Sequence, residues 1–116
     1  MKTTFRIEAL TRAVHVDSAG NTVETVNRFE RPVFEVRLVC GGRIAHDYVT
    51  PGSSYRKTET GFELSRWGKL VAAALNTERP EARVDPGVLI GRAVDIETKE
   101  DERGRERVVT YGSVRK

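Results

Sequence analysis

The sequence predicts a small, mainly β domain, built as a barrel with one α-helix near residues 63–75. Three observations predict this fold. Apolar residues alternate with polar ones in several short runs, turn residues recur every few positions, and one stretch has helical spacing instead. The expected order is several strands, one helix and two more strands. An α+β roll has the same order and remains the alternative.

Length and composition predict a single domain over residues 1–116. The chain is long enough to bury one apolar core and too short for two. Charged residues make up 32% and hydrophobic residues 38%, and the hydrophobic residues are clustered and periodic, so we expect the chain to fold.

The N-terminal part predicts one strand followed by a hairpin. Apolar residues recur at even spacing up to a dense turn signal at residues 17–21 (DSAGN). Pro32 cannot donate to a ladder, so any strand just before it should be short or lie at an edge. The evenly spaced residues are Phe5, Ile7, Val14 and Val16.

The strongest β pattern covers residues 33–50. In residues 33–40 apolar side chains point to one face, whereas Glu35 and Arg37 point to the other. Gly41-Gly42 then provides a turn. Residues 43–50 return with a second alternating set, which together predicts a hairpin. The first set is Phe34, Val36, Leu38 and Cys40, and the second is Ile44, His46 and Tyr48.

After the break at residues 51–54, the polar stretch 55–61 predicts an exposed loop, and residues 63–75 predict the helix. Asn76 and Pro80 close the helix. Trp67 lies on its apolar stripe and is expected in the core. The stripe consists of Leu64, Trp67, Leu70, Val71, Ala74 and Leu75.

The C-terminal part predicts two strands, near residues 92–99 and 106–114, joined by a charged hairpin tip at 100–105. One face of the last strand should carry Val108, Thr110, Gly112 and Val114, and the other Arg107, Val109, Tyr111 and Ser113.

No enzyme, metal or cofactor is expected. Both histidines lie in strand-like runs, and no nucleophile elbow or phosphate loop is present. One cysteine with two histidines cannot form the usual structural zinc sets, so Cys40 is expected as a buried, inert thiol. The N-terminus lacks a signal-peptide core and no apolar run approaches the roughly 18 residues of a membrane span, which predicts a cytoplasmic protein without membrane contact.

Cations interleaved with aromatic residues predict a site for single-stranded nucleic acid, although the net charge is only +3. Cations follow phosphates while aromatic rings stack on bases. The hairpin tip also carries four acidic residues at 100–106, which is equally typical of a solvated face. The residues expected to contact phosphates are Arg37, Arg43, Arg56, Lys57, Arg92, Arg105 and Arg107, and those expected to stack are Tyr48, Tyr55 and Tyr111.

Residues 33–114 contain a Phe-x-Val strand, a helix rich in Leu and Ala, a Leu-Ile-Gly-Arg turn, a Gly-containing tip and a last strand. These segments are residues 34–36, 64–75, 89–92, Gly104 and 108–114. In this layout the chain resembles a family of small phage-encoded, OB-like accessory proteins that bind single-stranded DNA. The resemblance implies an OB-like barrel and a role in phage or mobile-element replication or recombination, and it does not extend to residues 1–31.

A second function remains open: a protein-interaction module, such as a phage-type accessory or inhibitor, that pairs with a partner through an exposed strand edge. The modest net charge and the mixed-sign hairpin favour it. For the first function DNA is preferred over RNA as the partner, and a homo-oligomer is compatible with the sequence.

Overall fold

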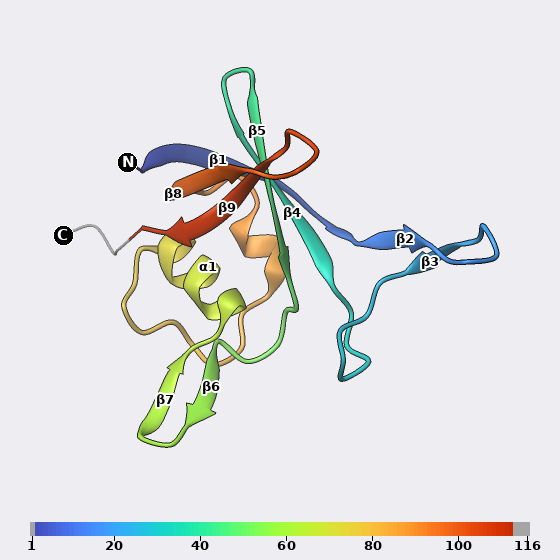
Figure 1. Ribbon diagram of the computed structural model, residues 1–116. Helices are drawn as coiled ribbons and strands as arrows, with labels where there is room; N and C mark the ends of the chain where they lie inside the picture. Colours follow the sequence, from blue (N-terminus) through green and yellow to red (C-terminus); the bar gives the residue numbers. More distant parts are fainter. Residues whose placement is uncertain (1, 113–116) are drawn as a thin grey trace.

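The computed structural model describes residues 2–112, and five of its strands close a barrel in the order β1-β4-β5-β9-β8 (Figure 1). Neighbouring strands are antiparallel except β5 and β9, which are parallel. This closed barrel with a single α-helix confirms the predicted fold class, is OB-like, and replaces the α+β roll. The strands are β1 (Thr3–Arg12), β4 (Phe34–Cys40), β5 (Arg43–Val49), β8 (Ala93–Glu100) and β9 (Glu106–Tyr111).

The β4–β5 hairpin forms as the alternation predicts. Val36 and Leu38 of β4 are fully buried, whereas Arg37 between them is exposed. Gly41 has a φ of 59° in the turn, a left-handed conformation that glycine adopts without strain. Cys40, expected to be buried, is only half-buried at the end of β4, although it packs against the core. The inner face of the hairpin is therefore mostly apolar, with the buried carboxylate of Asp47 as an exception, whereas Glu35 and Arg37 lie on its outer face.

Strand β1 closes the barrel because it pairs on both sides. Its first part pairs with β8 and the rest with β4, and the register shifts between Ile7 and Ala9. Such an irregularity bends a strand and increases its twist, which barrel closure requires.

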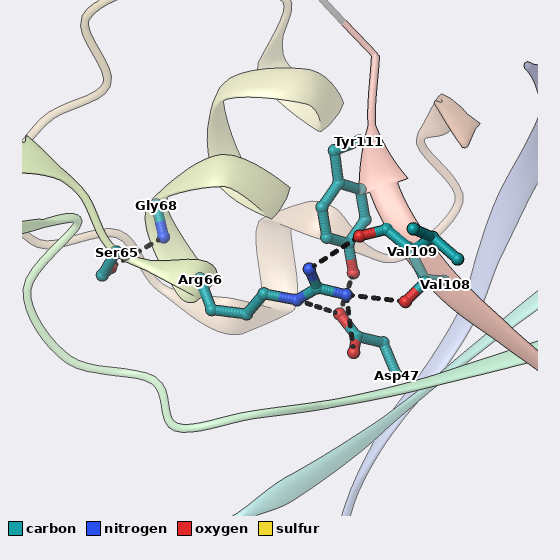
Figure 2. A network of polar contacts seen from close by, with 7 residues as sticks. All are labelled: Asp47, Ser65, Arg66, Gly68, Val108, Val109 and Tyr111. Atoms are coloured by element: carbon teal, nitrogen blue, oxygen red, sulfur yellow. Dashed lines mark hydrogen bonds and ion pairs between the residues drawn. The ribbon is translucent and has the colours of Figure 1, made fainter. Parts of the chain in front are cut away.

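Helix α1 (Arg66–Leu75) lies between β5 and β8 in the sequence and packs against the barrel core. The side chain of Ser65 caps its N-terminus by accepting a hydrogen bond from the backbone N–H of Gly68 (Figure 2). The helix therefore starts three residues later than predicted, because Glu63 and Leu64 belong to a strand. Trp67 is 1% exposed, which confirms its place in the core.

Two hairpins project from the barrel (Figure 1). β2 (Val14–Val16) and β3 (Thr22–Glu24) form the hairpin predicted around residues 17–21. β6 (Tyr55–Thr58) and β7 (Gly61–Leu64) form a second one where an exposed loop was predicted, which was wrong. Neither face of that hairpin is fully buried, so its sequence lacks the apolar alternation by which strands are recognised.

A short 3-10 helix, η1 (Pro86–Leu89), precedes β8, and its Leu89 is fully buried in the core. Strand β9 ends at Tyr111, so the predicted positions Ser113 and Val114 lie outside the described residues. Within residues 2–112 no helix is long and apolar enough to cross a membrane.

Candidate nucleic-acid interface

The outer face of β4 and β5 brings polar side chains from both strands together. The register places Glu35 opposite Tyr48 and Arg37 opposite His46, so all four side chains lie on the same face of the hairpin. Arg37 also lies 3.0 Å from the carboxylate of Glu8 on β1. We call this surface, with Arg105 and Arg107, the outer-face cluster.

The carboxylate of Glu35 lies at the centre of the outer-face cluster. It accepts a hydrogen bond of 3.0 Å from the Tyr48 hydroxyl and lies 3.2 Å from Nδ1 of His46. On its other side, Nη2 of Arg105 lies 3.7 Å away. Arg105 comes from the β8–β9 turn (residues 101–105), so a residue almost 60 positions from Tyr48 completes the cluster.

Arg107 covers one side of the Tyr48 ring. Its guanidinium carbon lies 4.7 Å from the ring centroid, a cation–π distance. Its buried Nε has no hydrogen-bond partner among the described residues. The contact with the Tyr48 ring therefore orients Arg107 without a hydrogen bond from its Nε.

The β8–β9 turn is ordered by Asp101. One of its carboxylate oxygens accepts hydrogen bonds of 2.9 Å from the backbone N–H groups of Arg103 and Arg105. The bond from Arg105, then that from Arg103, lowers the pKa of Asp101. An open depression of about 560 Å³ lies beside this turn, lined by Lys99, Glu100, Asp101, Glu102, Arg103, Arg107 and Val109.

Four of the ten predicted site residues thus lie in the outer-face cluster: Arg37, Tyr48, Arg105 and Arg107. Arg43 lies elsewhere, since it is paired with Glu106 and placed 5.1 Å from the ring of Phe5, a buried residue of the barrel interior. Hydrogen bonds from Arg43 and then Thr98 lower the pKa of Glu106.

Three more predicted residues lie on the β6–β7 hairpin, next to helix α1. The Tyr55 hydroxyl donates to the carbonyl of Pro80 at 2.8 Å, which fixes the ring. Arg56 is paired with Glu63 across the hairpin, and Lys57 is exposed opposite Phe62. The β6–β7 hairpin comes directly before helix α1 and lies beside it, below the barrel in Figure 1. These three residues are therefore not part of the outer-face cluster.

The last two predicted residues, Arg92 and Tyr111, also lie outside the outer-face cluster. Arg92 is exposed and donates to the carbonyl of Val88. Tyr111 donates its hydroxyl proton to Asp47, and Arg66 lies over its ring at 5.2 Å (Figure 2). The ring is thus enclosed between helix α1 and the barrel, and we leave Tyr111 out of the interface.

Arg66, Asp47 and Tyr111 form a network that the sequence did not reveal (Figure 2). Burial raises the pKa of the Tyr111 phenol well above its ordinary value, and the charge of Asp47 acts in the same direction. Burial lowers the pKa of Arg66, but its contacts with Asp47 outweigh this and raise it. Asp47 alternates with buried Ala45 and Val49 in β5, which is the signal for an inward-facing carboxylate that needs a partner.

Sequence periodicity also missed two exposed aromatic residues. Phe29 is 67% exposed in the connection between β3 and β4, and Phe62 is 76% exposed on β7. Neither belongs to an apolar alternation, so only their polar neighbours mark them as surface residues. No group of three or more His, Cys, Asp or Glu residues suited to a metal ion occurs in the described part of the chain.

No model of a known protein family, no curated protein and no solved structure matches this chain.

Proposed function

We propose that this protein is a non-enzymatic module that binds single-stranded nucleic acid, with DNA preferred, as a cytoplasmic replication or recombination accessory of a phage or mobile element. The outer-face cluster carries this proposal: Arg105 and Arg107 contact Tyr48, and Arg37 lies on the same outer face. Tyr48 and Arg37 belong to β5 and β4, the third and second strands of an OB-like barrel. In OB folds this face and the adjoining loops bind oligonucleotides.

The cluster offers both kinds of contact that a single strand requires. Arg105 and Arg107 provide positive charge for phosphates, and Tyr48 with the guanidinium plane of Arg107 provides a stacking surface for a base. All three side chains are held in place before binding, because Glu35 contacts Tyr48 and Arg105 while Arg107 lies on the ring. Such preorganisation reduces the entropy cost of binding.

A phosphate that binds an arginine of the cluster must displace the carboxylate with which that arginine is already paired. The Arg37–Glu8 pair is exposed, with 45% and 43% of the two side chains accessible. Exposed pairs of this kind contribute about 0–1 kcal/mol, so replacing Glu8 by a phosphate costs little.

The test is fluorescence anisotropy of a labelled oligo(dT) over a salt series, with duplex DNA as control. Three phosphate contacts predict a slope of log K against log[salt] of about −2, at about −0.7 per contact. The Arg105→Ala/Arg107→Ala variant should weaken binding and flatten the slope. The Arg56→Ala/Lys57→Ala variant removes the same charge from the β6–β7 hairpin and should bind as the unmodified protein does. Absence of binding at low salt contradicts the proposal.

A second candidate is the protein-interaction module. The β2–β3 hairpin is a separate two-stranded sheet, and its Val14 and Val16 are 57% and 67% exposed. Exposed apolar edges of this kind pair with strands of partner proteins. A partner that survives nuclease treatment at a fixed ratio and is lost on Val14→Asp/Val16→Asp substitution favours this function. A partner lost on nuclease treatment favours nucleic acid.

A further inference from the structure

We propose that Phe29 is a second base-stacking site, which extends the interface from the outer-face cluster along the connection between β3 and β4. This inference rests on the proposed function. In the turn at residues 27–31, a nucleobase would stack on the Phe29 ring, and the adjoining phosphates would contact Arg28 and Arg31.

The turn that carries Phe29 is fixed by Asn27. The Asn27 side-chain oxygen accepts hydrogen bonds from the backbone N–H groups of Phe29 at 2.8 Å and Arg31 at 3.1 Å. The backbone N–H of Asn27 donates to the carbonyl of Arg31, and Glu30 has a φ of 60°. The phenylalanine is therefore presented to solvent by an ordered turn.

The ring has one side available for a base. The guanidinium carbon of Arg28 lies 4.8 Å from the ring centroid, and the residue remains 67% exposed. Arg28 and Arg31 outnumber the single acid Glu30 in this turn. An exposed aromatic ring with Arg28 on one side, and with Arg31 two residues further along the chain, matches a stacked base with flanking phosphates. A docking surface for a protein usually needs a larger contiguous apolar area.

The turn is attached to the end of the barrel where the outer-face cluster lies. Val33 is bonded through its backbone to Thr25 and Ala13. The chain then enters β4, where Glu35 lies opposite Tyr48. Glu35 is the fourth residue after Arg31, so the two lie at most roughly 13 Å apart at about 3.3 Å per residue. One extended strand of nucleic acid can therefore reach both sites.

The test compares oligo(dT) of about 4 to 16 nucleotides, the range of OB-fold site sizes, on the unmodified protein and two variants. Phe29→Ala removes the proposed site. Phe62→Ala is the matched control, because Phe62 is similarly exposed but lies on the β6–β7 hairpin. Both side chains are on the surface, so both variants should keep the circular dichroism spectrum of the unmodified protein.

Phe29→Ala should leave the affinity for the shortest oligonucleotide unchanged and lower that for the longest by about 5- to 150-fold, the effect of one lost stack. Phe62→Ala should match the unmodified protein at every length. Equal losses in both variants, or no loss in Phe29→Ala, overturn the inference.

A direct readout comes from Phe29→Trp. Its indole fluorescence should be quenched by long oligonucleotides and not by the shortest, against a constant background from buried Trp67. If Arg105→Ala/Arg107→Ala weakens binding while the Phe29 variants show no effect, only this inference fails. If the unmodified protein binds no oligonucleotide of any length, the proposed function itself fails.

Discussion

The guanidinium of Arg66 donates two hydrogen bonds to the carboxylate of Asp47, from Nε to Oδ2 at 3.0 Å and from Nη2 to Oδ1 at 3.1 Å (Figure 2). The same guanidinium donates to the carbonyls of Val108 and Val109. One side chain at the start of α1 thus connects the helix to β5 and β9, the two strands whose parallel pairing closes the barrel.

Asp47→Ala should lower the free energy of unfolding by about 2–3 kcal/mol. Loss of one partner from a fully buried pair costs about 3–5 kcal/mol, and the cost is lower here because 39% of the Arg66 side chain is exposed. Urea denaturation measures the difference. Glu63→Ala, which breaks the exposed pair with Arg56, should cost less than about 1 kcal/mol. Equal losses in the two variants would contradict the role assigned to Asp47.

Gly68→Ala should destabilise the protein, although alanine is the better helix former by about 1 kcal/mol. A Cβ at Gly68 would lie 1.9 Å from the carbonyl oxygen of Ser54, so helix α1 or the chain at Ser54 must move. Overpacking of this kind costs roughly 1–3 kcal/mol. Thermal unfolding followed by circular dichroism checks this, with Lys69→Ala at the exposed neighbouring position as the control. A raised Tm for Gly68→Ala would show that the contact is not tight.

Tyr111 should make the protein lose stability in alkali. The folded state holds the phenolic proton more tightly than the unfolded chain, because burial and then Asp47 raise the pKa of Tyr111. Its contribution is fully present below the unfolded pKa of about 10 and is lost as the pH rises toward the folded pKa. Tyr111→Phe should cost about 1 kcal/mol at neutral pH.

The same substitution should make the loss above pH 10 shallower, by up to about 1.4 kcal/mol per pH unit. Urea midpoints of both proteins between neutral pH and about pH 11 measure this. Parallel curves would mean that Tyr111 titrates as an exposed phenol does.

Tyr48 should contribute to binding through its ring rather than its hydroxyl. Tyr48→Ala removes the surface on which Arg107 lies and should weaken oligonucleotide binding by about 1–3 kcal/mol. Tyr48→Phe keeps that surface and loses only the hydrogen bond to Glu35, so its affinity should stay within about 1 kcal/mol of the original. Anisotropy at fixed salt separates the two, and an equal loss in both variants would assign the effect to the hydroxyl.

Local patterns predicted the parts of the fold that local residues determine. The β4–β5 hairpin follows from alternation around Gly41-Gly42, and Trp67 follows from helical spacing. The parallel contact of β5 with β9 was not predictable, because it joins residues some 60 positions apart and depends on how the sheet curves. The β6–β7 hairpin was missed because neither of its faces is fully buried.

The candidate site was predictable to a similar extent. Period-two spacing placed Arg37 on one face of residues 33–40 and Tyr48 on one face of residues 43–50, and the register of the hairpin shows that these two faces are the same one. That Arg105 and Arg107 reach Tyr48 depends on barrel closure, and that Tyr111 is enclosed depends on the inward-facing Asp47. Sequence spacing describes the faces of single strands but not which strands become neighbours.

The most direct test of the central claim is a ¹H–¹⁵N NMR titration of the labelled protein with an unlabelled single-stranded oligonucleotide at low salt. The perturbed amides should cluster in β4, β5 and the β8–β9 turn, and for longer oligonucleotides they should include residues 27–31, while β6 and β7 stay unchanged. A spectrum unchanged at saturating oligonucleotide, or changes confined to the β6–β7 hairpin, would contradict the claim.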